Sequence, residues 1–331
     1  MIKNNDTKEL LKRTKSIWNK PGIRQWQDWV IISENKIIGR NGYTNFLYLS
    51  DDESIKDTPP CMVQATNLIN FLDTTDDELE IKTEENSVKM RNKKKIVSYN
   101  YPCTFDDFIK DSTLIDTTLE YTECDLQDLT YNFETIFKDN KDFCNIFVKK
   151  GKAYSTNGKI ITVTKTKLPD TDIPFTMQEF IPTAESVFVD SNYIIVNEGG
   201  LFVLGFRIDA VARKVLGIVP REFNTDYKIT FPDNTKEIVR TLKKMNTEYR
   251  KSDGLVCVHV SGSTIKMALA NAKNIKYVEE FESPEEALEE MTFNVDPDAL
   301  LKGLELSTEF YYNDRFLYVK NDKAERFIAI E

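Results

Sequence analysis

The sequence is poor in the residues from which metal sites and catalytic triads are usually built. It has 331 residues but one histidine, His259, which lies in the strand-like run VCVHVSG. The five cysteines are scattered and never form a C-x-x-C pair, a usage that favours a reduced protein of the cytoplasm. We therefore expect no metal site and no cofactor.

Enzyme motifs and membrane segments are missing as well. There is no P-loop, no G-x-G-x-x-G, no H-E-x-x-H and no G-x-S-x-G. Asp106, Asp107 and Asp111 imitate a two-carboxylate metal site, but they lie in an expected surface connector without a second ligand group. No apolar run approaches the length of a membrane span, and the N-terminus lacks the apolar segment of a signal peptide. The sequence thus predicts neither catalytic residues nor contact with a membrane.

What the chain does contain is a basic helix in an acidic protein. The formal net charge is −10, yet residues 233–251 combine a helical apolar repeat with a purely basic stripe. The apolar face is formed by Ile238, Val239, Leu242, Met245 and Tyr249. The opposite face carries Lys236, Arg240 and Lys243. Most charged stripes are only solvated, but one sign concentrated on one helix of an acidic protein favours a face presented to a partner.

The same pattern occurs at the start of the chain. Residues 7–20 place Lys8, Lys12 and Lys15 at the spacing of the later basic stripe. Leu10 and Leu11 occupy the positions that correspond to Ile238 and Val239 in residues 233–251. Two basic helices in the same register indicate an internal repeat.

Helix and strand signals then recur in one order along the whole chain. Helices are expected over 7–20 and 63–72, over 126–137 and 177–181, and over 233–251 and 297–304, with strands after each. The length and the 40% hydrophobic content fit several domains. We predict an α+β fold of three repeated domains, 1–102, 103–222 (with the connector) and 223–331, each with two helices on antiparallel sheets.

Several short motifs strengthen this interpretation. They are Phe293-Asn294-Val295 before the last helix, Ile218-Val219-Pro220 before the third domain, the closing Phe327-Ile328-Ala329-Ile330, and the loop Pro21 to Arg24. With these motifs the chain resembles the bacterial β-type DNA sliding clamps, the processivity factors of replicative polymerases. The resemblance implies a head-to-tail homodimer that closes a six-domain ring. The many Lys, Asn and Ile residues and the slightly short chain would suit a phage-encoded clamp.

The resemblance implies that duplex DNA passes through the ring, bound through phosphates and without sequence preference. The replicative polymerase and a clamp loader are the other expected partners. The inner wall would carry Lys8, Lys12, Lys15, Lys236, Arg240 and Lys243, flanked by Arg13, Lys20, Arg24 and Lys244. Glu134 and Pro182 weaken the claim of the middle domain to contact DNA. The outer rim would include Glu285, Glu286, Glu289 and Glu290.

A second implied site is an apolar pocket between the second and third domains, where partner peptides dock. By their positions relative to the clamp family, the residues implied to line this pocket are Leu168, Val219, Pro220, Ile328 and Ile330. A plain edge strand with one buried face is the alternative interpretation of the last two. Two alternatives to the ring remain: a monomeric protein that tethers a polymerase to DNA, and a β-rich phage structural protein.

Overall fold

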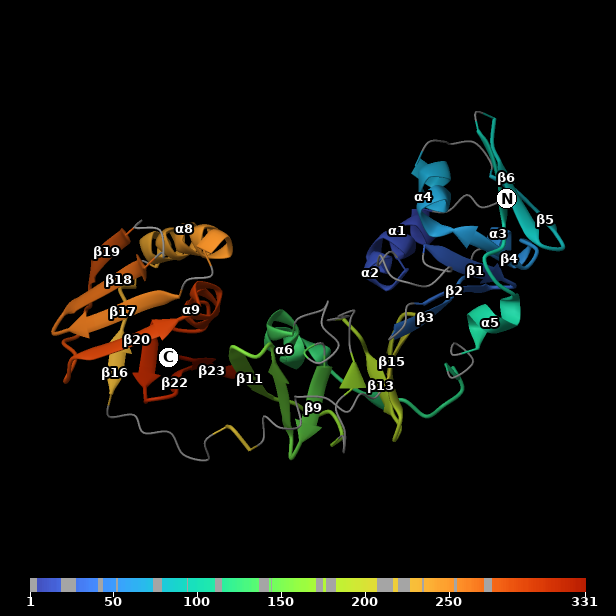
Figure 1. The fold of residues 1–331 in the computed structure, drawn as a ribbon. Helices are drawn as coiled ribbons and strands as arrows, with labels where there is room; N and C mark the ends of the chain where they lie inside the picture. The colour runs from blue at the N-terminus through green and yellow to red at the C-terminus, as the bar shows by residue number, and fades with distance from the viewer. Residues whose placement is uncertain are drawn as a thin grey trace. The chain divides into compact units, whose positions relative to one another are not determined.

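The computed structural model describes most of the chain (Figure 1). The described residues are 5–18, 28–40, 44–51, 53–73, 79–93, 95–110, 115–136, 143, 145–170, 175–176, 183–206, 217–219, 227–233, 235–252, 255–270 and 276–331. Lys20, Arg24, Pro220 and the helix expected over 177–181 lie outside them. Among the described helices, none is both long and apolar enough to cross a lipid bilayer.

Packing divides the chain into two compact units. Unit 1 comprises Met1–Gln127 and Lys167–Ile208, and unit 2 comprises Asp128–Thr166 and Asp209–Glu331. The middle third of the sequence is therefore shared between them. The reason is the hydrogen bonding of the strands, because part of the middle third continues a sheet of the first third and another part continues a sheet of the last third.

In unit 1, eight strands form one antiparallel sheet in the order β4-β1-β2-β3-β15-β14-β13-β8. Their bounds are β1 Trp29–Ser33, β2 Lys36–Arg40, β3 Thr44–Leu49, β4 Cys61–Gln64, β8 Thr122–Glu123, β13 Ser186–Val189, β14 Tyr193–Glu198 and β15 Leu201–Phe206. The junction between the thirds is the pair β3 and β15, in which Leu201 lies opposite Tyr48 and Gly205 opposite Thr44. Trp29, Ile31 and Phe108 belong to the core on one face of this sheet.

The rest of unit 1 is a small sheet and several helices. The sheet β5-β6-β7 is antiparallel, with β5 Glu80–Glu84, β6 Ser87–Arg91 and β7 Ile96–Asn100. The helices are α1 Asn5–Arg13, α2 Lys15–Trp18, α3 Glu53–Lys56, α4 Ala65–Asp73 and α5 Phe105–Ile109, and β12 is a short strand, Phe175–Thr176. Helices α1 and α4 pack side by side (Figure 1). The connector predicted over 105–116 begins as α5, whose Phe108 is buried in the core.

Unit 2 is built on a second long antiparallel sheet, which includes strands in the order β9-β10-β11-β23-β22-β21-β16. The bounds are β9 Asn145–Lys149, β10 Lys152–Thr156, β11 Ile160–Lys165, β16 Lys228–Thr230, β21 Glu309–Tyr312, β22 Phe316–Lys320 and β23 Ala324–Ala329. Here the junction between the thirds is the pair β11 and β23, with Ile160 opposite Ile328 and Thr164 opposite Ala324. The turn η2 Leu126–Leu129 leads into α6 Thr130–Thr135, which packs on β10 and β11.

A four-stranded sheet in the order β19-β18-β17-β20 completes unit 2. Its strands are β17 Val256–Ser261, β18 Thr264–Ala270, β19 Lys276–Glu282 and β20 Met291–Val295. Helices α8 Lys236–Ser252 and α9 Pro297–Leu304 pack against each other over it (Figure 1). Helix α9 begins as predicted, since the Asp296 side chain accepts a hydrogen bond from the Ala299 N–H and Pro297 opens the first turn.

Two predicted helices are shorter in the structure. The helix expected over 7–20 is broken at Thr14, whose hydroxyl donates to the Leu10 carbonyl at 2.9 Å. Threonine hydroxyls that bond back to the preceding turn weaken a helix at that point. The helix expected over 126–137 is a 3-10 turn followed by six residues of α-helix, Thr130–Thr135.

Candidate nucleic-acid interface

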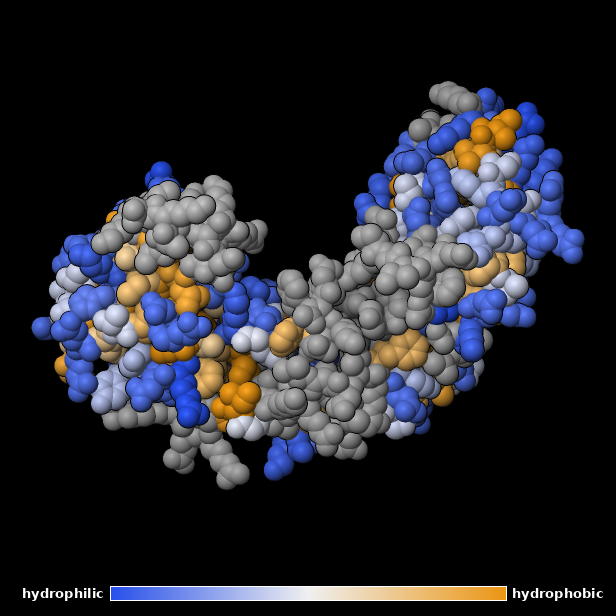
Figure 2. Space-filling model, viewed as in Figure 1, coloured by the Kyte–Doolittle hydropathy of each residue, from blue (hydrophilic) through white to orange (hydrophobic). Residues whose placement is uncertain are grey.

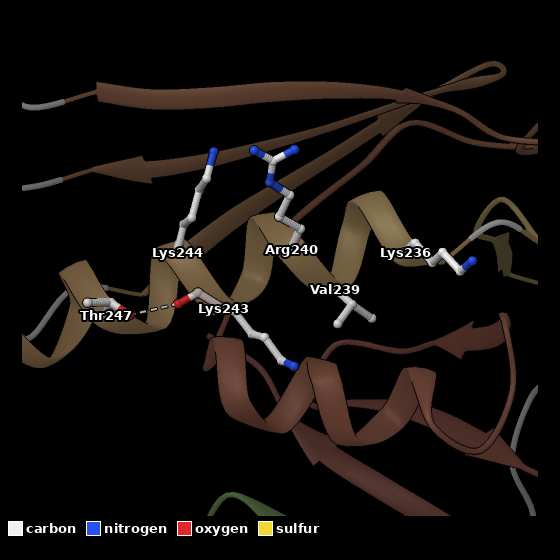
Figure 3. A pocket seen from close by; sticks show the side chains of 6 residues that line it. All are labelled: Lys236, Val239, Arg240, Lys243, Lys244 and Thr247. Carbon is white, nitrogen blue, oxygen red and sulfur yellow. Dashed lines mark hydrogen bonds between the residues drawn. The ribbon is translucent and has the colours of Figure 1, made fainter.

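Helix α8 separates apolar and basic side chains cleanly. Ile238, Leu242 and Met245 are buried in the core of unit 2. The opposite face borders a shallow depression lined by Lys236, Val239, Arg240, Lys243, Lys244 and Thr247 (Figure 3). The basic stripe is thus formed as predicted, but Val239 lies on it and is half-buried, so its assignment to the apolar face was wrong.

The cations of this face spread to both sides of the helix. In Figure 3, Arg240 and Lys244 extend to one side and Lys243 extends toward α9. Within the described part of the chain, no carboxylate lies within ion-pair distance of Lys236 or Arg240. Lys243 interacts electrostatically with Glu305, a carboxylate at the end of α9. Lys236 and Arg240 therefore present positive charge that no carboxylate of the described residues pairs with.

Helix α1 carries a similar stripe in a different electrostatic setting. The Lys8 Nζ lies 2.5 Å from the Asp73 Oδ1, and the Lys12 Nζ lies 3.6 Å from the same oxygen. The Lys8 side chain is only 19% exposed, although a residue of a DNA-facing stripe is expected to be exposed. Arg13 is ion-paired with Glu198. The hydrogen bond with Lys8 lowers the pKa of the Asp73 carboxyl, and the same bond raises the pKa of Lys8.

Lys15 lies on α2, beyond the break at Thr14, and its side chain is exposed. Burial raises the pKa of the nearby Asp28 carboxyl above its ordinary value. Hydrogen bonds from Thr66 and the charge of Lys15 act in the opposite direction and reduce this rise. Sequence spacing alone placed Lys15 on one continuous helix with Lys8 and Lys12, and the structure corrects this.

Solved structures of bacterial polymerase clamps match this chain along nearly its whole length. The DNA polymerase III β chain of Streptococcus pneumoniae is 16% identical, with a TM-score of 0.71 over 99% of this chain and 97% of that chain. A sliding clamp from Pseudomonas aeruginosa is 12% identical, with a TM-score of 0.71 over 98% of either chain. This chain has the β sliding-clamp fold.

The clamp fold is the α+β arrangement of antiparallel sheets that the sequence predicted, and that prediction is confirmed. The β clamp of Helicobacter pylori, solved with a DNA ligase peptide, has the same fold, with 12% identity and a TM-score of 0.69 over 99% of this chain and 98% of that chain. No protein-family model matches the sequence, and no curated protein does so either.

The residues expected to form the peptide pocket of a clamp fold occupy different surroundings. Ile328 is 0% exposed and packs in the core of unit 2, beside Gly303. Its side chain therefore supports the fold and does not line an open pocket. Ile330 is half-buried against the same core, Leu168 is buried in unit 1, and Pro220 lies outside the described residues.

Val219 belongs to another apolar cluster of unit 2. It packs against Ile161, Val163, Tyr318 and Phe327 on the opposite face of the long sheet. Side chains alternate along β23, so Phe327 faces this cluster while Ile328 faces the core. The pocket residues predicted from the sequence do not include Phe327, although the period of two in the closing strand places it on the face opposite Ile328.

Glu134 of the middle third is held by a buried guanidinium. Arg326 is 0% exposed, and its Nη2 donates to the Glu134 Oε2 at 3.0 Å. Its Nη1 donates to the Lys302 carbonyl, and the guanidinium lies 5.5 Å from the centre of the Tyr131 ring. The Glu305 Oε2 lies 3.8 Å from the Nη1. This network, absent from the sequence-based predictions, ties α6, α9 and β23 together inside unit 2.

Proposed function

We propose that the protein is a DNA sliding clamp, a non-enzymatic factor that encircles duplex DNA and holds a replicative polymerase on it. The observation that carries the proposal is the exposed basic face of α8 on a chain that has the clamp fold from end to end. A ring around DNA needs positive charge toward the phosphates and gains nothing from it elsewhere. This accounts for basic helices in a chain whose net charge is −10.

The proposed contact is with phosphates and without base recognition. A protein that slides must bind every sequence equally well, and lysine and arginine side chains on a helix face provide such contacts. The partners are duplex DNA, the replicative polymerase and a clamp loader, as the sequence predicted. The domain limits 1–102, 103–222 and 223–331 describe the three repeats in chain order.

We expect a homodimer, because three domains supply half of a six-domain ring. Static light scattering at micromolar protein should give twice the chain mass of 38.3 kDa. Strand β19 ends the four-stranded sheet and carries the exposed Val278, Glu280 and Glu282. The β5-β6-β7 sheet has exposed basic residues and an exposed Ile96 on the edge strand β7. Both strands end their described sheets, and open sheet edges favour strand pairing between copies.

Reversal of Glu280, which is paired with Lys266, and of Glu282 to lysine should convert the dimer into monomers that circular dichroism shows to be folded. Asp314→Lys and Asp322→Lys, which change the same amount of charge at exposed turns, serve as the matched control. A strictly monomeric wild-type protein at high concentration and low salt would contradict the ring. It would favour a monomeric tether, which should bind linear duplexes directly, whereas a structural protein should bind none.

The proposal includes a docking site for partner peptides in unit 2. The Val219 side chain is half-buried on the apolar cluster that contains Phe327, and its neighbour Ile218 is exposed. Val219→Asp would bury an unpaired charge in any apolar contact made there. We expect it to abolish polymerase stimulation in a primer-extension assay while retention on DNA stays at the wild-type level.

Two further variants locate that site. Ile330→Asp tests the half-buried position predicted from the sequence, and Ile328→Asp should unfold the protein because Ile328 is fully buried. If Val219→Asp and Ile330→Asp both stimulate the polymerase like the wild type, the docking site lies elsewhere. The test of ring closure is independent of this result.

A further inference from the structure

One carboxylate lies between the first two lysines of the α1 stripe. Asp73 is the last residue of α4, and α4 packs beside α1. Its Oδ1 is 2.5 Å from the Lys8 Nζ and 3.6 Å from the Lys12 Nζ. Lys12 also lies 3.7 Å from the Glu9 Oε1 one helical turn away. The pair of lysines therefore already has carboxylate partners inside the chain.

Helices α1 and α8 differ in how many of their basic side chains are paired with carboxylates. On α1, Lys8 and Lys12 share Asp73, and Arg13 is paired with Glu198. On α8, Lys236 and Arg240 have no carboxylate at ion-pair distance among the residues that the structure describes. Two helices with the same basic spacing thus present different amounts of uncompensated charge. Figure 2 shows hydrophilic side chains over much of the coloured surface in this view.

We propose that Asp73 competes with DNA phosphates for Lys8 and Lys12, so that α8 supplies the principal phosphate contact of this clamp. This inference rests on the proposed function. The number of phosphates that a protein neutralises sets its salt dependence, at about 0.9 in log–log slope for every phosphate. A lysine that is paired with a carboxylate contributes less, because the pair carries no net charge.

The contact of Asp73 with Lys12 should contribute little to stability. Exposed ion pairs contribute little to folding, since water screens them and two side chains must be ordered. Asp73 is 40% exposed and Lys12 is 44% exposed, so their pairing is of this kind. Near a duplex, however, the carboxylate adds repulsion and holds the lysines away from phosphates. Its effect should therefore be seen in DNA association and scarcely in unfolding.

The test is Asp73→Asn, which keeps the shape of the side chain and removes its charge. Binding of the full-length protein to a labelled duplex is measured by fluorescence anisotropy across a salt series. We expect tighter binding, by roughly 3- to 30-fold at low salt, and a log–log slope steeper by about 0.9 to 1.8, as one or two phosphate contacts are gained. Asp322→Asn, an exposed aspartate of the β22–β23 turn with the same charge change, should leave both values unchanged.

A second pair of variants assigns the gain to the named lysines. Lys8→Gln with Lys12→Gln should weaken binding little in the wild-type background and should remove the gain in the Asp73→Asn background. Circular dichroism should show all variants folded. An unchanged slope in Asp73→Asn, in a protein whose binding is lost on charge reversal of α8, would overturn this inference and leave the proposed function intact. Binding that neither Asp73→Asn nor the α8 reversal alters would overturn both.

Discussion

Replacing Lys236, Arg240 and Lys243 with glutamate should weaken binding to duplex DNA by roughly 100-fold or more at low salt. All three side chains are exposed on one face of α8, and the buried face consists of other residues. Each lost phosphate contact should reduce the log–log salt slope by about 0.9, so the slope should fall by about 2 to 3. The loss should be equal on duplexes of different sequence, because the contacts meet phosphates.

A matched control for this variant lies on the long sheet of unit 2. A depression at one end of strands β10, β11, β22 and β23 is lined by several residues, among them Lys152, Lys165 and Lys320. Their reversal changes the net charge by the same amount, so it separates a local contact from a general effect of charge. If both triple variants lose binding equally, α8 is not the DNA contact. Circular dichroism should show both proteins folded.

The second large effect is expected at Glu134, although its side chain is 46% exposed. Exposed residues usually change the free energy of unfolding by less than about 0.5 kcal/mol. Glu134, however, pairs at 3.0 Å with the fully buried Arg326, so Glu134→Ala would leave a buried guanidinium without its closest carboxylate. We expect a loss of about 2 kcal/mol, below the ~3–5 kcal/mol of a fully buried pair, because Glu305 lies 3.8 Å away.

Denaturant unfolding of a double-mutant cycle tests this expectation. Arg326→Met keeps much of the buried volume and removes the charge, and in that background Glu134→Ala should cost little. Glu309→Ala removes an equally exposed carboxylate from Lys228, which keeps Glu285 as a partner, and should be nearly neutral. A neutral Glu134→Ala would show that the buried cation does not depend on this pair.

Much of the fold was predictable because its signals are local. Helix caps, turns and apolar repeats lie within a few residues of one another, so most of the described helices and strands could be placed from the sequence. The cap of α9 at Asp296 and the hairpin of β17 and β18 are examples. The break at Thr14 was missed, because helical spacing continues across it without a glycine or proline.

Pairings between distant residues could not be predicted in the same way. Asp73 neutralises Lys8 across 65 positions of sequence, and no spacing rule connects a lysine stripe with the last residue of another helix. Arg326 and Glu134 are further apart still. The orientation of the closing strand was uncertain for another reason. The period of two was visible in the sequence, but it did not show whether Phe327 or Ile328 faces the helices.

The two long sheets also affect which domains of this fold could be exchanged between related chains. The sequence predicts a repeat in thirds, but hydrogen-bonded ladders cross the predicted limits at β3 with β15 and at β11 with β23. A domain excised at those limits would leave each neighbour with an open strand edge, and at β15 this edge is apolar along nearly its whole length. A transplanted domain would have to reproduce the register of both ladders as well as its own core. Exchange of a domain in this fold is therefore constrained by the register of its junction strands.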